Sequence, residues 1–164
     1  MKNNIIFRKA EIKDLKDILK LNFELFKKEH KKFDKSLNLE WTYKNGRKYF
    51  KDRVTKKDGF VEVVKNNDKT VGYLCGGISE FLPYRKRARY AELENMFIAK
   101  EFRGKNLGAK LTKDFINWCK KSKIDYISVR ASSLNKPALG FYRILGFKDY
   151  DTILEMRLLK RKIK

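Results

Sequence analysis

The sequence predicts an α/β fold in which a mixed central β-sheet carries helices on its faces. The middle of the chain reads as strand, helix, strand, helix, strand, an order in which helices connect parallel strands. The length of 164 residues suits one domain spanning residues 1–164 with one core. Apolar residues form 42% of the chain, which is enough to fill that core although 37% of the residues are charged.

The N-terminal third is predicted to contain one strand and two helices. A strand at residues 5–8 precedes a helix whose first turn is acidic, as the helix dipole favours. A second helix is predicted over residues 41–54, and the Lys-rich stretch 27–35 is interpreted as a helix end and a loop. The first helix is recognised by apolar residues at three- and four-residue spacing, namely Ile12, Leu15, Leu19, Phe23 and Phe26.

A β-hairpin and further elements follow. Residues 59–64 and 70–79 are predicted as an antiparallel pair, joined by a turn of Asn, Asp and Lys residues at 66–69. No internal repeat and no dividing linker interrupts this order. The remaining elements are a strand at 90–99, a helix at 107–121, a strand at 126–131, a helix at 136–145 and a last strand at 153–159.

The strand that follows the hairpin contains an irregularity. In a regular strand, Leu93 would face the opposite side of the sheet from Met96 and Ile98. One inserted residue would bring these apolar side chains onto the same face. We therefore predict a β-bulge near Glu94 and Asn95.

Charge and composition restrict the partners only broadly. The net charge of +21 would attract nucleic acid, an acidic surface or a polyanionic cofactor, but the lysines are spread along the chain and are interpreted mainly as a solvated surface. The absence of a signal peptide and of long apolar runs predicts a cytoplasmic protein without membrane contact. Cys75 and Cys119 have no CxxC spacing and no nearby His, so we expect no metal site.

The most informative segment is the turn at residues 103–109, between a strand and an amphipathic helix. Its small and turn-tolerant residues let backbone N–H groups converge on an anion, and the helix N-terminus adds partial positive charge. We therefore predict a pyrophosphate cradle, in which Gly108 allows close approach of the ligand to the backbone. The GxxxxGK[ST] and GxGxxG patterns are absent, which argues against kinase and dehydrogenase functions.

At this turn the chain resembles the GNAT superfamily of acetyltransferases, whose acetyl-CoA signature is Q/R-x-x-G-x-G/A. Arg103, Asn106 and Gly108 occupy the three defined positions. Asn106 replaces the usual Gly, and Asn is one of the few residues that adopt left-handed backbone conformations with little strain. The resemblance implies the GNAT fold, with a bulged, splayed pair of parallel strands, and acetyl-CoA as co-substrate.

The resemblance extends over nearly the whole chain. The pattern Arg8-x-Ala10-x-x-x-Asp14 is similar to the family's first strand and helix, and residues 135–147 are similar to its late motif. By this resemblance, acetyl-CoA is expected to contact the backbone of the bulged strand, the phosphate turn and the last helix. The implied residues are Met96, Phe97, Ile98, Arg103, Gly104, Lys105, Asn106, Leu107, Gly108, Ala109, Asn135 and Tyr142.

Acetyl transfer needs a neutral amine, a polarised carbonyl and a proton for the departing thiolate. The family places a tyrosine beside the CoA sulfur, and Tyr142 matches that position; a phenol with a pKa near 10 can protonate a more basic developing thiolate. The alternative is that Tyr142 only packs in the core. Asn135 either bonds to the cofactor or only caps the last helix.

The general base has two candidates on the bulged strand. In several GNAT enzymes a glutamate on this strand removes the amine proton, often through water, and the interval from Arg103 favours Glu92 over Glu94. The alternative is that either carboxylate only pairs with a lysine.

The acceptor site is the least specified part. Trp41, Tyr43, Phe81 and Tyr84 are candidates for an aromatic pocket with Glu40, Glu80 or Glu94 receiving a cation, and each of these also has an ordinary packing or surface explanation. Arg85, Lys86 and Arg87 either hold a phosphate or form a solvated loop, and the single histidine, His30, is expected to be exposed.

Taken together, the sequence predicts an N-acetyltransferase that acts on a primary amine, either of a small molecule or of a protein N-terminus or lysine. The alternative is a basic module that binds nucleic acid or the ribosome on the same fold. The absence of RNA-binding signatures lowers that alternative, and nucleic acid is expected to bind only non-specifically. A homodimer is left open.

Overall fold

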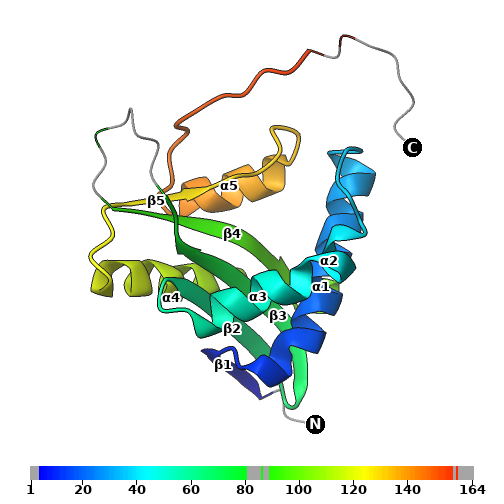
Figure 1. Cartoon of the computed structure of the whole chain (residues 1–164), viewed down its shortest axis with the longest axis vertical. Helices are drawn as coiled ribbons and strands as arrows, with labels where there is room; N and C mark the ends of the chain where they lie inside the picture. The colour runs from blue at the N-terminus through cyan, green and yellow to red at the C-terminus, as the bar shows by residue number, and fades with distance from the viewer. Residues whose placement is uncertain (1–3, 81–85, 87–88, 157, 159–164) are drawn as a thin grey trace.

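The computed structural model describes residues 4–80, 86, 89–156 and 158, and Figure 1 shows their arrangement. One mixed sheet has the strand order β1-β2-β3-β4-β5, in which β4 and β5 are parallel and the other neighbours are antiparallel. The predicted mixed α/β fold is therefore confirmed. The strands are β1 (Ile5–Lys9), β2 (Gly59–Asn66), β3 (Lys69–Ile78), β4 (Tyr90–Ile98) and β5 (Tyr126–Val129).

Helices cover both faces of the sheet (Figure 1). One core lies under α1 and α3 and includes Phe50 and Tyr73, and a second lies under α4 and includes Leu93 and Phe115. Because β2, β3 and β4 contribute side chains to both cores, the centre of the sheet is buried on both sides. The helices are α1 (Leu15–Lys32), α2 (Trp41–Lys44), α3 (Gly46–Thr55), α4 (Leu107–Lys121) and α5 (Lys136–Ile144), with short 3₁₀ turns η1 (Ile12–Asp14) and η2 (Lys100–Phe102).

The single helix predicted over residues 41–54 is wrong, because the segment divides into α2 and α3 at Asn45. Two long-range contacts account for the break. The buried Thr42 hydroxyl donates to Asn22 Oδ1 at 2.9 Å and holds α2 against α1. Gly46 is packed so closely that a Cβ there would lie 3.0 Å from Leu19. Local periodicity carries no information about either contact.

The last predicted strand, at 153–159, is also wrong for the described residues, since 153–156 and 158 lie in no strand. The preceding strand is shorter than predicted and ends at Val129. A strand is held by hydrogen bonds to a neighbouring strand, and the described chain places none beside residues 153–156.

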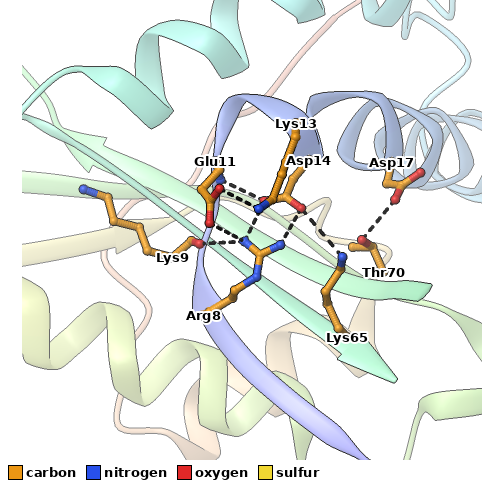
Figure 2. A network of polar contacts seen from close by, with 8 residues as sticks. All are labelled: Arg8, Lys9, Glu11, Lys13, Asp14, Asp17, Lys65 and Thr70. Atoms are coloured by element: carbon orange, nitrogen blue, oxygen red, sulfur yellow. Dashed lines mark hydrogen bonds and ion pairs between the residues drawn. The ribbon is translucent and has the colours of Figure 1, made fainter. Parts of the chain in front are cut away.

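An ion-pair network joins β1 to the start of α1, as Figure 2 shows. Arg8 donates from Nη1 and Nη2 to the two carboxylate oxygens of Asp14, at 2.7 Å each. Asp14 Oδ2 also accepts the Glu11 N–H at 2.8 Å, in a capping box that starts the helical segment. The pattern that the sequence shares with GNAT proteins at residues 8–14 thus has a structural cause: a buried carboxylate fixes the direction of α1.

Candidate active site

The β4 strand leaves one of its edges open in its second half. β5 pairs with β4 only from Tyr90 to Leu93, whereas β4 continues to Ile98. In the described chain no strand covers the β5-side edge of residues 94–98. Ile98 O at the end of this edge accepts a hydrogen bond from Arg103 Nε, and the other outward-facing backbone N–H and C=O groups have no strand partner in the described chain and could pair with an extended ligand. Met96, Phe97 and Ile98, which were predicted to contact acetyl-CoA, lie here.

A β-bulge at Glu94 lies where the half of β4 that pairs with β5 gives way to the half that does not. The predicted irregularity in this strand is confirmed. On the partner strand, Cys75 faces Asn95 and the next residue, Gly76, faces Leu93, so Glu94 has no partner. Leu93 and Met96 consequently both pack on the α4 side of the sheet.

The predicted phosphate turn has the geometry of an anion site. Gly104 (φ 73°) and Asn106 (φ 58°) both adopt left-handed conformations, so Asn106 serves in place of the family's Gly. α4 starts directly afterwards, and Lys110 N–H is the first in the helix to bond to a carbonyl one turn back, that of Asn106 at 3.0 Å. The N–H groups of residues 107–109 have no such carbonyl and point toward the start of α4.

Basic side chains flank this turn. Arg103 donates from Nε to Ile98 O at 2.8 Å and lies over the ring of Phe97 at 5.1 Å from its centroid. The side chain of Lys105 lies over the ring of Phe102 at the same distance. Arg103 is therefore fixed at the junction between the open edge of β4 and the turn.

A residue that the sequence did not single out, Lys28 on α1, completes the basic cluster. Burial, and next the positive charge of Arg103, lower the pKa of Lys28. Two cations held together favour an anion between them. Both line a cavity of about 360 Å³, together with Leu21, Glu24, Phe97, Ala99, Lys100 and Glu101.

The sequence contained a signal for Lys28. Leu21, Glu24 and Lys28 follow one another at three- and four-residue spacing and so share one stripe of α1. Lys28 was instead interpreted as part of a helix end, but α1 continues to Lys32.

Two further predicted cofactor contacts belong to α5: Asn135 is the N-cap of this helix, and Tyr142 lies within it. Asn135 caps α5 by accepting Ala138 N–H at 3.2 Å, and its Nδ2 donates to Glu29 Oε1 at 3.2 Å. Burial raises the pKa of Glu29. Both polar atoms of Asn135 are thus engaged within the protein, which accounts for its burial without a cofactor contact.

Tyr142 packs in the core and also lies near a charge. Its ring centroid lies 5.1 Å from that of Phe141 and 5.6 Å from that of Phe147. Burial raises the pKa of Tyr142, and the negative charge of Glu29 raises it further. The phenol is thereby kept in its protonated form, which a proton donor requires.

Gly108 lies where α4, α5 and β4 converge. A Cβ at this position would lie 3.5 Å from Phe141 Cζ and 3.6 Å from Met96 Cε. A larger side chain would therefore fill the space between the open strand and the helix that carries Tyr142.

The two candidate bases have different surroundings. Glu94 accepts hydrogen bonds from the Tyr49 hydroxyl and from two nitrogens of Arg53, one of them Nε at 3.0 Å. Among the described residues, Glu92 forms one ion pair, and its carboxylate lies 3.5 Å from Nε of the largely exposed Arg130. The carboxylate of Glu92 therefore has free acceptor capacity, whereas that of Glu94 is occupied.

The predicted aromatic acceptor pocket is described only in part. Trp41 stacks on Phe26 and meets the edge of Tyr49, so it belongs to a packed row of rings. Tyr43 is 65% exposed and leans on Phe23. Phe81, Tyr84, Arg85 and Arg87 lie outside the described residues, while Glu80 and Lys86 are exposed.

Two smaller expectations can be compared with the structure. Glu40 pairs with Lys44 at 2.5 Å on the surface. The expectation that His30 is exposed is wrong: the residue is half-buried, with Nδ1 3.2 Å from Leu37 O, because the loop after α1 folds back onto the helix.

Within the described ranges, no group of three or more His, Cys, Asp or Glu side chains is placed to hold a metal ion. In the same part of the chain, no helix has both the length and the apolar character that crossing a membrane requires.

Comparisons with known proteins agree with this geometry. The chain is 31% identical over 156 residues to an uncharacterized N-acetyltransferase of Methanocaldococcus jannaschii, covering 90% of this chain and 63% of that protein. The chain thus spans less than two thirds of the length of this relative.

Solved structures share the fold. A mutant BH1408 protein from Bacillus halodurans superposes with a TM-score of 0.78 at 20% identity, covering 94% of this chain and 99% of the other. A predicted acetyltransferase from Clostridium acetobutylicum with acetyl-CoA gives 0.77 at 22% identity, covering 96% and 99%. Residues 14–147 match the Acetyltransferase (GNAT) family, and the chain therefore belongs to that family.

Proposed function

We propose that this protein transfers the acetyl group of acetyl-CoA to a primary amine. The observation that carries the proposal is the opening of β4 away from β5 directly beside the anion-binding turn. Membership of the GNAT family supports the same activity. The acceptor is an amine of a small molecule or of a protein, and its identity is the open part of the proposal.

The residues present fit acetyl-CoA. Unbonded N–H groups at the start of α4 suit a pyrophosphate, and Arg103 and Lys28 supply two positive charges in the cavity that they line together. The free edge of residues 94–98 suits the amide-containing pantetheine arm, because that arm can add hydrogen bonds as a short strand would. Gly108 keeps the space between Met96 and Phe141 open.

Acetyl-CoA supplies an acetyl group activated as a thioester. The hydroxyl of Tyr142 donates its proton to the sulfur as the carbon–sulfur bond breaks; its raised pKa keeps that proton in place beforehand and also makes the phenol a weaker acid than a free one. Glu92 takes the proton that the amine must lose, directly or through one water. Transfer is direct, in a complex that holds both substrates.

Glu92 is the better base because Glu94 already has a structural task. Arg53 and Tyr49 hold the Glu94 carboxylate on the α3 side of the sheet. If Glu94 took up a proton, it would lose its ion pair with Arg53.

Calorimetry with purified protein tests the proposal. In the titrations, we expect acetyl-CoA and CoA each to bind at one site. In a separate activity assay, we expect the release of the CoA thiol to depend on an added primary amine. Small amines, peptides with a free N-terminus and lysine peptides with a blocked N-terminus separate the acceptor classes. A folded protein that binds RNA selectively at high salt but has no affinity for acetyl-CoA would contradict the proposal and favour the nucleic-acid alternative.

A further inference from the structure

The carboxylate of Glu29, in the second half of α1, is half-buried and has no cation bound to it. Its Oε1 accepts a hydrogen bond from Asn135 Nδ2 at 3.2 Å. In the described part of the chain, no lysine or arginine forms an ion pair with this carboxylate, and Lys28 acts on it only through its charge from farther away. By contrast, the buried carboxylate of Asp14 binds Arg8. The fold therefore leaves the charge of Glu29 without a direct counterion.

Glu29 lies close to the proposed proton donor. Its negative charge raises the pKa of Tyr142, so the carboxylate and the phenol interact. Asn135 joins Glu29 to the start of α5, the helix that carries Tyr142. Lys28, the preceding residue of α1, lies instead near Arg103 beside the phosphate turn. In the proposed function, on which this inference rests, Tyr142 marks the sulfur of acetyl-CoA, so Glu29 lies at the thioester end.

The surroundings of Glu29 favour a bound cation. Burial raises the pKa of this carboxylate, and the positive charge of Lys28 opposes the rise. A carboxylate whose pKa is raised by burial has lost solvation in its ionised form, and a cation that binds to it restores part of that stabilisation. Among the described residues, Glu29 Oε2 accepts no hydrogen bond and is available to such a cation.

The charge of the acceptor decides how much it needs this carboxylate. A lysine side chain or a simple alkylamine, with a pKa of about 10.4, is almost entirely protonated at pH 7, whereas an N-terminal α-amine, with a pKa of about 7.7–8.0, is partly neutral. The net charge of the chain is +21, and a field of that sign repels a cationic acceptor. A strongly basic amine therefore requires a local negative group at the thioester.

We propose that Glu29 binds the ammonium form of the acceptor beside the thioester, and that the protein acts on strongly basic primary amines, namely alkylamines or lysine side chains, rather than on N-terminal α-amines. The bond from Asn135 keeps one carboxylate oxygen in place, and the other oxygen receives the ammonium. Binding at Glu29 precedes the proton transfers described above and adds none to them.

A matched pair of acceptors tests the proposal. Ethylamine is protonated at pH 7, whereas 2,2,2-trifluoroethylamine has nearly the same shape and is largely neutral. Glu29→Gln removes the charge and keeps an acceptor for Asn135 Nδ2. In assays of CoA thiol release, we expect this variant to raise the KM for ethylamine by roughly tenfold or more, as the loss of a charge-assisted hydrogen bond predicts. The KM for trifluoroethylamine and the calorimetric Kd for acetyl-CoA should stay within a few-fold of wild type.

Two further variants separate a binding role from a structural one. Glu29→Asp keeps the charge but shortens the reach toward Asn135, and its KM for ethylamine should lie closer to wild type than that of Glu29→Gln. Asp68→Asn removes an exposed charge from the turn between β2 and β3 and should leave the KM unchanged. Peptides provide the second comparison: at pH 7 a lysine peptide with a blocked N-terminus should react faster than a lysine-free peptide with a free one.

The outcomes distinguish this inference from the proposed function. A wild type that acetylates ethylamine while Glu29→Gln leaves its KM unchanged, or raises the KM of both amines equally, would overturn the role of Glu29 and leave acetyl transfer in place. A larger loss in Glu29→Asp than in Glu29→Gln would show that Glu29 acts only through Asn135, and faster reaction of the α-amine peptide would overturn the acceptor class. A wild type that binds acetyl-CoA but releases no thiol with any amine would overturn the proposed function itself.

Discussion

The Asn135 side-chain amide donates to Glu29 Oε1 at 3.2 Å, and this bond joins the N-cap of α5 to the second half of α1. The two residues are 106 positions apart. The same amide caps α5 through its oxygen. The helix that carries Tyr142 is therefore linked to the helix that carries Lys28.

Glu29→Leu should destabilise the fold more than Glu29→Gln. Leucine leaves the buried Asn135 Nδ2 without an acceptor, which costs about 1–3 kcal/mol, whereas glutamine can still accept the bond. The pKa of Glu29 is raised in the folded state, so the carboxylate stabilises the fold less as pH rises through that pKa. Urea unfolding at pH 5 and pH 8 measures both effects. If both variants lost the same free energy of unfolding, the hydrogen bond to Asn135 would not contribute to stability.

Gly108→Val should weaken acetyl-CoA binding by roughly tenfold or more while the protein stays folded, because the added methyl groups enter the space between Met96 and Phe141. Calorimetry measures the affinity and circular dichroism the fold. Gly140→Ala is the control, since a Cβ there meets nothing within 4 Å. Unchanged affinity in a folded Gly108→Val protein would show that the cradle is misplaced.

Lys28→Ala should raise the Kd for acetyl-CoA by roughly tenfold, as expected for the loss of one charge-assisted contact to phosphate. The dependence of Kd on salt should also become shallower, because one cation fewer acts on the ligand. Lys16→Ala, exposed on the same helix and away from the cavity, is the control. An equal effect of both substitutions would indicate that only the diffuse charge of the surface matters.

Tyr142→Phe should lower kcat by roughly 10²-fold and leave the affinity for acetyl-CoA within a few-fold, because the hydroxyl acts as the thiolate departs. Tyr126→Phe, on the exposed start of β5, should leave both constants unchanged.

Glu92→Gln should also lower the rate, and most strongly at low pH, where the acceptor amine is largely protonated and most needs a base. Glu155→Gln is its control. Identical pH profiles for wild type and Glu92→Gln would remove Glu92 from the mechanism.

Asp14→Asn should destabilise the protein by about 1–3 kcal/mol at pH 7, since Arg8 loses its charged partner. Burial alone would raise the pKa of Asp14, but the hydrogen bonds from Arg8 and the Glu11 N–H outweigh it and lower the pKa. A lowered pKa means that the carboxylate stabilises the fold above pH of about 4 and that this contribution is lost as pH falls below it. The stabilities of wild type and variant should therefore approach each other as the pH falls through the lowered pKa of Asp14; a constant gap would contradict the assignment.

Much of the fold could be predicted because its signals are local. The phase change between Leu93 and Met96 located the bulge, and small, turn-tolerant residues between a strand and an amphipathic helix located the turn at 103–109, in which Asn106 is left-handed. What sequence reasoning missed depends on contacts between distant segments. Lys28 lies near Arg103 only in the folded protein. The hydrogen bonds from Arg53 to Glu94 and from Asn135 to Glu29 likewise form only after the sheet has assembled. The last strand was predicted from the alternation of apolar and polar residues, but this alternation does not identify a neighbouring strand with which the segment would pair.

The bulge at Glu94 has a consequence for how this region tolerates change. Side chains on either side of it keep their faces only because the strand holds one residue more than its partner. Deleting a residue between Leu93 and Met96 would turn Met96 and Ile98 toward α1 and Phe97 toward α4, and the cleft would lose its lining. Substitutions here alter single contacts, whereas a change in length would invert the whole second half of β4. The number of residues in this stretch is therefore under a stricter constraint than their identity.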